Sequence, residues 1–353
     1  MDILNNTIDE ISEDLINDII DIVKIPSVEG KSENGFPFGE NVANALNKAL
    51  KISQKLGFKT NNLDNYIGYA EYGEGEEYIG IIGHVDVVAE GEGWVHDPYG
   101  GEIENEKIYG RGVLDNKGPI MCALYGLYAI KKSGLELSKK IRIIFGTNEE
   151  TGFKDIPYYL KNEKPPIMGF TPDCKYPVVY GEKGMSRLKI TNENIVDKNE
   201  FLNYIDKLSD KVIVTFKEIE KVNDKLILNL KVKYDFSYKL DDVLNELENN
   251  LGKDTNIEVE LNYNPVYFDK DSKLVRGLQK AYEKVTNLDG TPVTTNGGTY
   301  AKVIPNIVPF GPSFPGQKGI AHNPDEYMDI EDIILNAKIF SNAIYELAKE
   351  DLC

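Results

Sequence analysis

The segment Tyr78-Ile-Gly-Ile-Ile-Gly-His-Val-Asp86 joins a short apolar run to two side chains that suit metal chemistry. Such a run, ending in polar residues, is typical of a strand buried on both faces in a sheet covered by helices. A second run, 141–146, ends in the same way just before Glu149 and Glu150. Because open α/β sheets bind ligands beyond the carboxyl ends of their strands, we expect these polar side chains to meet there.

The chain offers enough histidines and carboxylates to bind two metal ions. A zinc ion binds imidazole nitrogen and carboxylate oxygen, and two neighbouring ions need one shared carboxylate plus about two further ligands each. The candidate ligands are His84, Asp115, Glu150, Asp173 and His322. Each one alone also fits an ordinary strand end, turn or loop. However, the chain has only three histidines, and two of them fall in contexts suited to metal binding. We interpret the third, His96, as a structural loop residue.

Two further acidic residues flank the candidate ligands. Asp86 lies two positions after His84, so that in an extended segment its carboxylate can orient the imidazole ring or accept its other N–H. Glu149 directly precedes Glu150, within reach of a water molecule at the metals, and is the candidate general base. Asp86 and Glu149 are therefore the predicted catalytic residues.

The composition agrees with a soluble cytoplasmic enzyme. The 353 residues are enough for two domains, and 41% of them are hydrophobic. Neither an apolar run of about eighteen residues nor a basic N-terminal segment occurs, so we expect no membrane span and no secretory signal. Three widely spaced cysteines indicate a reducing compartment. The net charge of −18 would repel nucleic acid and anionic membranes, and we expect neither as a partner.

Helices and strands alternate through the first half of the chain. Apolar residues at helical spacing predict amphipathic helices over 8–23 and 42–50, and a mostly apolar helix over 118–132. Residues 186–263 have a different pattern of strand, helix, two strands, helix and strand, the split β-α-β-β-α-β arrangement. Because His322 must return to the metal site, we interpret this segment as an insertion.

The expected fold is therefore α/β, with a mixed, mostly parallel sheet that has helices on both faces. Residues 1–184 and 265–353 are predicted to form the catalytic domain. Residues 185–264 are predicted to form an inserted, ferredoxin-like small domain.

Seven short motifs occur in order along nearly the whole chain. They are Gly-His-Val-Asp-Val-Val at 83–88, Gly-Trp-Val-His-Asp-Pro at 93–98, Tyr-Gly-Arg-Gly-Val-Leu-Asp-Asn-Lys-Gly-Pro at 109–119, Asn-Glu-Glu-Thr-Gly at 148–152, Thr-Pro-Asp at 171–173, Gly-Gly-Thr-Tyr-Ala at 297–301 and Ala-His-Asn-Pro-Asp-Glu at 321–326. This set resembles the co-catalytic zinc peptidases that include acetylornithine deacetylase, succinyl-diaminopimelate desuccinylase, aminoacylase and carboxypeptidase G. The PepV-type bacterial dipeptidases are the most similar members.

The resemblance implies how the ligands divide between two metal ions. Asp115 would bridge the ions, His84 and Asp173 would complete one site, and Glu150 and His322 would complete the other. Two divalent ions are therefore the implied cofactors. We expect zinc, with manganese or cobalt as alternatives, because all three accept histidine and carboxylate ligands.

The resemblance also implies the roles of the remaining groups. Glu149 would deprotonate the attacking water and return the proton to the leaving amine, while Asp86 would brace His84. The peptide bond after Asp115 would be cis. The inserted domain would be a lid or a dimerisation domain.

The inserted segment departs from the family pattern. Family lids carry a Gly-x-x-Ala-His-like stretch whose histidine polarises the scissile carbonyl, whereas residues 191–197 here are Thr-Asn-Glu-Asn-Ile-Val-Asp. PepV-type dipeptidases have a longer, doubled lid whose arginine binds the substrate carboxylate, and the nearest match is Lys233, a point charge without a bidentate fork. Gly297, Gly298 and Thr299 are candidate donors to the substrate, with a tight turn as the alternative.

The expected function is metal-dependent hydrolysis of dipeptides or small peptides by an activated water, with Glu149 as general base. Weaker catalysis or a different substrate is expected, because the lid histidine is absent. One alternative is an amidohydrolase that deacylates N-acyl amino acids. Another is a non-catalytic relative that uses the lid as an interaction surface. We expect a homodimer formed through the lid, with a monomer as the alternative.

Overall fold

The computed structural model describes residues 2–192, 194–195, 197–222, 225–252 and 254–349, and the chain divides into two compact units. Unit 1 comprises Met1–Val179, Asp269–Val293 and Thr299–Cys353. Unit 2 comprises Tyr180–Phe268 and Thr294–Gly298.

The division differs slightly from the predicted boundaries of 185–264, and it adds residues 294–298 to the inserted unit. The cause is a small sheet that the sequence pattern did not reveal. In it, β9 (Val179–Glu182) lies between β14 (Val266–Tyr267) and β15 (Val293–Thr295).

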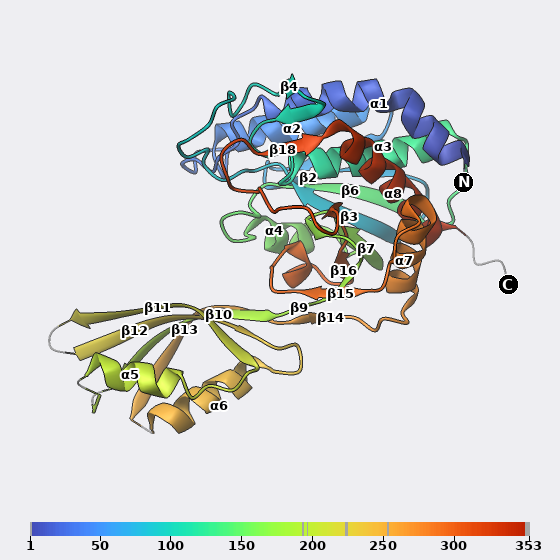
Figure 1. The fold of residues 1–353 in the computed structure, drawn as a ribbon. Coiled ribbons are helices and arrows are strands. Elements are labelled where there is room, and N and C mark those ends of the chain that lie inside the picture. The colour runs from blue at the N-terminus through green and yellow to red at the C-terminus, as the bar shows by residue number, and fades with distance from the viewer. Residues whose placement is uncertain (1, 193, 196, 223–224, 253, 350–353) are drawn as a thin grey trace. The chain divides into compact units, whose positions relative to one another are not determined.

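Unit 1 is built on a six-stranded sheet (Figure 1). Its strands, in order across the sheet, are β1 (Lys59–Leu63), β2 (Ile67–Tyr72), β6 (Lys140–Gly146), β3 (Tyr78–His84), β7 (Met168–Thr171) and β16 (Ile307–Pro309). The last four run parallel to one another, whereas β1 and β2 are antiparallel to their neighbours. The predicted mixed, mostly parallel sheet is confirmed. Every residue of β3 is buried, which explains the continuous apolar run in the sequence.

Helices cover both faces of this sheet, as predicted (Figure 1). One face carries α2 (Glu40–Lys55), α3 (Lys117–Lys132) and α8 (Ile330–Ala348), with α1 (Asp2–Val23) packed on α3 and α8 and α7 (Lys273–Thr286) packed on α8. The other face carries α4 (Asp155–Asn162) and the short 3-10 helix η1 (Tyr300–Lys302). Gly126 lets α3 approach α8, because a Cβ there would lie 2.9 Å from the backbone nitrogen of Ser341. Among the described residues, no helix has the length and apolar character that a membrane span needs.

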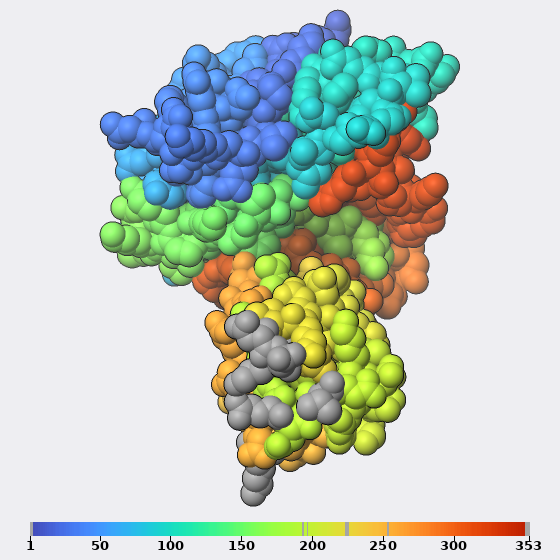
Figure 2. Space-filling view, turned by 90° about the vertical axis from the view of Figure 1, so that its left-hand side faces the viewer, coloured from blue at the N-terminus to red at the C-terminus, as the bar shows by residue number. Residues whose placement is uncertain are grey.

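Two smaller sheets in unit 1 attach the C-terminal part of the chain to its front half. β18 (Tyr327–Asp329) pairs with β5 (Lys107–Tyr109), which pairs with β4 (Glu102–Glu104). β17 (Pro312–Ser313) pairs with β8 (Cys174–Lys175). In Figure 2 the red C-terminal segment accordingly lies against the cyan segment near residue 100. The loop between β17 and β18 is thus anchored at both ends.

Unit 2 has the predicted β-α-β-β-α-β order. Its elements are β10 (Gly184–Asn192), α5 (Lys198–Ile205), β11 (Val212–Val222), β12 (Lys225–Tyr234), α6 (Leu240–Leu251) and β13 (Thr255–Tyr263). The four strands form an antiparallel sheet in the order β11-β12-β10-β13. Buried and half-buried residues alternate from Leu226 to Tyr234, and the buried set packs against α5 and α6 around Phe201 and Leu247. The alternation in the sequence therefore predicted the inner face correctly.

Candidate active site

The five candidate ligands lie at strand ends or in loops of unit 1. His84 is the last residue of β3, Glu150 and Asp173 follow β6 and β7, and Asp115 precedes α3. His322 lies in the loop between β17 and β18. Because β6, β3 and β7 are parallel neighbours, their carboxyl ends open on the same edge of the sheet.

The ligand atoms form two triplets, and Asp115 belongs to both. Single ligand atoms of His84, Asp115 and Asp173 lie within 4.8 Å of one another, and the same holds for Asp115, Glu150 and His322. Nε2 of His84 lies 3.1 Å from Asp115 Oδ1 and 3.7 Å from Asp173 Oδ2. Nε2 of His322 lies 3.0 Å from Asp115 Oδ2 and 3.1 Å from Glu150 Oε2. The two oxygens of one carboxylate therefore face two separate histidines.

The buried ring of His84 is oriented from the side opposite its ligand atom. Its Nδ1 donates to the main-chain carbonyl of Asp86 at 2.9 Å, which leaves the lone pair of the neutral ring on Nε2. The sequence predicts that the Asp86 carboxylate orients the ring or accepts this N–H, and in the structure the main-chain carbonyl of Asp86 is the acceptor. That carboxylate has its Oδ1 3.5 Å from Nδ1, while its Oδ2 accepts the backbone N–H of Glu150 at 3.1 Å. Asp86 thus links the segment after β3 to the segment after β6.

Several carboxylates lie close together in this part of unit 1 and change the pKa values of neighbouring groups. Burial, reinforced by nearby carboxylates, raises the pKa of Glu149 well above its usual range. Burial opposes a charge on His84, but hydrogen bonding with Asp115 and other carboxylates raises the pKa of this imidazole nonetheless. Hydrogen bonds with Asp115 and Glu150 raise the pKa of His322 to about 10. The cluster therefore favours positive charge at its centre.

The donor set fits two divalent cations. Lone pairs on imidazole nitrogen and carboxylate oxygen face one another at hydrogen-bond distance, and without a proton or a cation between them they repel. Asp115 supplies the shared carboxylate that two adjacent ions need. Three protein ligands for each ion leave a position for water or substrate, as a catalytic ion requires.

Asn116 joins three of the ligand segments, which the sequence did not predict. Its Nδ2 donates to the Pro172 carbonyl at 2.6 Å, and its Oδ1 accepts the backbone N–H of His84 at 3.3 Å. Gly83 makes this approach possible, because a Cβ there would lie 2.2 Å from Asn116 Oδ1. The peptide bond between Asp115 and Asn116 is cis, as the resemblance implies. The only signal in the sequence was the place of this asparagine next to a candidate ligand.

His96 has structural contacts, as predicted. Its ring stacks on Tyr109 with the centroids 3.7 Å apart, and its two nitrogens lie 3.1 Å from Asp325 and Glu104. It belongs to neither ligand triplet. The contact with Asp325 ties the segment before β4 to the loop that carries His322.

The predicted substrate-binding residues are divided between the units. Lys233, on β12, donates from Nζ to the carbonyl of Asn296 within unit 2, and burial lowers the pKa of its ammonium group. Gly297 and Gly298 are exposed in the same unit. Thr299 is buried in unit 1, where its hydroxyl accepts a hydrogen bond at the start of η1. Their contact with substrate stays a prediction.

Residues 80–346 match the family model described as peptidase family M20/M25/M40. The chain belongs to this family. The matched range includes all five candidate ligands as well as Asp86 and Glu149. The protein is therefore a metallopeptidase.

Curated relatives cover nearly the whole chain. A putative dipeptidase of Bacillus subtilis, YtjP, is 30% identical, with 96% of this chain and 98% of that protein aligned. The Beta-Ala-Xaa dipeptidase of Lactobacillus delbrueckii subsp. lactis is 29% identical, with 96% of each protein aligned. The Bacillus alignment extends over 452 residues, more than the 353 of this chain, so parts of that relative have no counterpart here.

Solved structures share the fold at low sequence identity. Aminopeptidase PepT of Bacillus cereus has a TM-score of 0.74 at 16% identity, over 96% of this chain and 99% of its own. Human carnosine dipeptidase 1 has a TM-score of 0.71 at 14% identity, over 98% of each chain. Bacillus subtilis YXEP, described as a dinuclear metal binding peptidase of family M20, has a TM-score of 0.70 at 13% identity, over 95% of this chain and 98% of its own.

Proposed function

We propose that this protein is a dipeptidase that uses two divalent metal ions to hydrolyse dipeptides or small peptides. The observation that carries the proposal is the position of Asp115, whose two carboxylate oxygens lie 3.1 and 3.0 Å from the Nε2 atoms of His84 and His322. A carboxylate in this position can be shared between two ions. Zinc is the proposed native metal, with manganese and cobalt as alternatives.

In this proposal each ion has three protein ligands. His84, Asp115 and Asp173 would hold one ion, and Asp115, Glu150 and His322 would hold the other. Bound ions would polarise the scissile carbonyl and lower the pKa of the attacking water. Asp86 fixes the imidazole ring of His84 through its main-chain carbonyl.

We assign the role of general base to Glu149. Burial and neighbouring carboxylates raise the pKa of Glu149, which makes its carboxylate a stronger proton acceptor than an exposed glutamate. Its carboxylate takes a proton from the attacking water as the water oxygen bonds to the carbonyl carbon. The same proton then passes to the nitrogen of the breaking C–N bond, and the amine leaves.

Dipeptides are the proposed substrates because the similar curated proteins are named as dipeptidases. The alternative is a deacylase of N-acyl amino acids, which would use the same ligand set. The purified protein is therefore assayed on free dipeptides and on N-acyl amino acids, with and without added divalent metal. Metal-dependent hydrolysis of free dipeptides supports the proposal. Cleavage of acylated substrates alone, or of neither class, rejects it.

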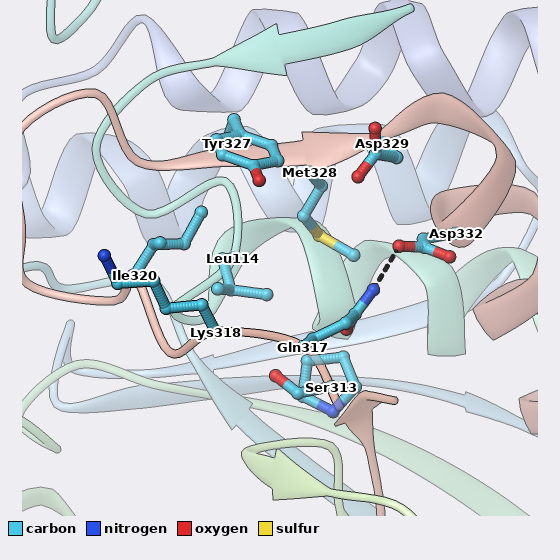
Figure 3. A pocket seen from close by; sticks show the side chains of 10 residues that line it. Leu114, Ser313, Gln317, Lys318, Ile320, Tyr327, Met328, Asp329 and Asp332 are labelled. Carbon is cyan, nitrogen blue, oxygen red and sulfur yellow. Dashed lines mark hydrogen bonds between the residues drawn. The ribbon is translucent and has the colours of Figure 1, made fainter. Parts of the chain in front are cut away.

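A small pocket beside the ligand loops is the proposed subsite for a substrate side chain (Figure 3). Its volume is about 130 Å³, and its lining includes Leu114 and Ile320, which are close in sequence to Asp115 and His322. Met328 adds apolar surface. The volume of about 130 Å³ suits a side chain of moderate size, and the lining offers it both polar and apolar contacts.

The missing lid histidine predicts slower turnover than in relatives that have it. All three histidines of the chain, His84, His96 and His322, lie outside residues 185–264. Loss of one preorganised donor to a developing oxyanion typically costs about two to three orders of magnitude in turnover. We propose that Lys233, with Gly297, Gly298 and Thr299, supplies the remaining substrate contacts. A non-catalytic role would leave the half-buried Glu149 without a purpose.

We also propose that unit 2 forms a lid through which the protein dimerises. β11 is an edge strand of the unit 2 sheet, and it exposes Ile213, Phe216 and Val222. An edge of this kind favours pairing with a second copy. Light scattering on the wild type and on Phe216→Lys tests this, and a monomeric wild type rejects it. Cys122 is a free cysteine, in keeping with the cytoplasm as the proposed location.

A further inference from the structure

Glu326 is a buried carboxylate that binds the loop leading to Asp115. Its Oε1 accepts hydrogen bonds from the backbone N–H groups of Gly112, Leu114 and Asp115 at 3.1, 2.9 and 3.1 Å. The exposed fraction of Glu326 is 0%. One oxygen atom therefore fixes the backbone of three residues, the last of which is the shared ligand.

The other oxygen of Glu326 binds Arg111, whose side chain is also buried. The guanidinium donates to Glu326 Oε2 at 2.7 Å. It also donates to the main-chain carbonyls of Glu90 and Asn323 at 3.1 and 3.3 Å. Asn323 directly follows His322 in the sequence. The pair thus contacts the loop of the shared ligand and the loop of the most distant ligand.

A purely stabilising role explains this pair poorly. Removing two charges from water costs several kcal/mol per ion, and a well-packed apolar pair of the same volume is often as stable. What an apolar pair cannot do is accept three backbone N–H groups at one point. The hydrogen bonds of Glu326 therefore specify the path of the 112–115 backbone.

We infer that Glu326, held by Arg111, is a positioning residue that orients Asp115 and the His322 loop for metal binding. This inference rests on the proposed two-metal function and adds a residue that contacts neither substrate nor metal. Groups behind metal ligands typically change metal affinity or activity by about 10- to 100-fold when they are replaced. Because the pair contacts both loops, its loss is expected to weaken both metal sites.

Mn²⁺ binding to the metal-free protein tests the inference without a measurement of turnover. Wild type and Glu326→Gln are dialysed against chelator and titrated with Mn²⁺, with calorimetry and the electron paramagnetic resonance of the free ion as readouts. Glutamine retains an oxygen for the backbone N–H groups but presents an N–H₂ group to Arg111. We expect the Kd for Mn²⁺ to rise by about 10- to 100-fold.

Glu163→Gln is the matched control. Glu163 also accepts a hydrogen bond from a buried arginine, Arg142, at 2.9 Å, and it accepts another from Tyr69 at 2.8 Å. Neither of these partners belongs to a ligand loop. This control is expected to lower the thermal stability of the protein and to leave the Kd for Mn²⁺ within about twofold of wild type.

A folded Glu326→Gln variant with an unchanged Kd overturns the inference, even if its melting temperature falls. If that variant fails to fold, Arg111→Lys replaces it, because lysine keeps the charge and leaves the backbone hydrogen bonds of Glu326 intact. A rise of up to about tenfold in its Kd supports the inference, and no rise overturns it. If the wild type binds no Mn²⁺, the same titrations are made with Zn²⁺, and a wild type that binds neither ion contradicts the proposed function itself. If the wild type binds and the variants bind equally well, only the positioning role fails.

Discussion

Unit 1 and unit 2 differ in the number of candidate functional side chains that they carry. In unit 1, ligands from five separate segments meet in two triplets around Asp115, and buried hydrogen bonds hold the segments together. In unit 2, a regular antiparallel sheet carries no histidine within 185–264, and Lys233 is its charged candidate for substrate binding. The contrast is that the candidate metal ligands all lie in unit 1, whereas the segment proposed to select substrate has no histidine within 185–264.

The largest expected effect is on turnover, and it tests whether the chemistry belongs to unit 1 alone. Glu149→Ala removes the proposed base, and general base catalysis typically contributes about 10²- to 10⁴-fold. We expect kcat to fall within that range while the protein still binds two equivalents of metal. Steady-state kinetics and metal analysis of the same sample measure both quantities. Unchanged kcat would reject Glu149 as the base, and lost metal would make it a ligand instead.

Metal removal is expected to affect the two units unequally. A ligand present at about 1,000 times its Kd stabilises the folded state by about 4 kcal/mol, and chelation withdraws this contribution. Hydrogen exchange measured by mass spectrometry should therefore increase in segments 83–88, 109–119, 148–152 and 321–326 of unit 1. Exchange in β10 to β13 of unit 2 should stay the same. Equal increases in both units would show that unit 2 also depends on the ions.

A smaller effect concerns the pH dependence of stability in unit 1. The buried carboxyl of Asp155 accepts hydrogen bonds from Thr147 and Tyr300, yet burial raises its pKa from 3.8 to about 6. A carboxyl with a higher pKa in the folded state stabilises that state below pH 3.8 and loses this contribution as the pH rises through about 6. We expect up to about 3 kcal/mol of such dependence, at about 1.4 kcal/mol for each pKa unit. Urea unfolding at several pH values should show it in wild type and not in Asp155→Asn.

Glu246 in unit 2 is the matched residue, because its pKa shifts in the opposite direction to that of Asp155. Burial opposes its charge, but hydrogen bonds from Tyr238 and Ser209 lower its pKa below the usual value of 4.5. Its contribution is therefore present above pH 4.5 and is lost as the pH falls below it. In wild type Glu246 makes the protein less stable as the pH falls below 4.5, and Glu246→Gln should remove this change. Asp155 makes the protein more stable as the pH falls from about 6, and Asp155→Asn should remove that opposite change. If both variants altered the pH dependence of the free energy of unfolding in the same direction, the pKa shifts assigned to these two residues would be contradicted.

The smallest expected effect tests substrate binding by unit 2. Lys233→Ala should raise KM for free dipeptides by about fivefold, with little change in kcat, because a half-exposed charge pair contributes about 1 kcal/mol or less. Lys231→Ala is the control, since Lys231 lies two residues earlier on the same face of β12. Equal changes in KM for the two variants would indicate a general charge effect, and no change for either would remove Lys233 from the proposed site.

Much of unit 1 could be predicted because its signals are local. The apolar run of β3 and the polar residues after β3, β6 and β7 indicated both the buried sheet and its ligand-bearing edge. The return of His322 to Asp115 and Glu150 has no local signal and was predicted from the resemblance. In the structure His322 Nε2 lies 3.0 Å from Asp115 Oδ2 and 3.1 Å from Glu150 Oε2.

The supporting contacts could not be predicted, since they depend on which loops meet in space. Glu326 lies 214 positions after Gly112, one of the residues whose N–H it accepts. Asn116 is adjacent to a ligand, but its partners come from β3 and from Pro172. For Asp86, strand periodicity predicted the side chain that faces His84 but not that the carbonyl would accept the ring N–H. Periodicity indicates which face a residue occupies, and it does not identify the acceptor atom.

The order in which the ligands occur along the chain has a consequence for biosynthesis. His84, Asp115, Glu150 and Asp173 all precede unit 2, whereas His322 follows it. On a ribosome that adds about 5–20 residues per second, the last imidazole therefore emerges well after the other four groups. A nascent or prematurely terminated chain has the His84 triplet but lacks the second one. Such a chain lacks one of the two proposed metal sites, so the proposed peptide-cleaving capacity is delayed until His322 has been synthesised.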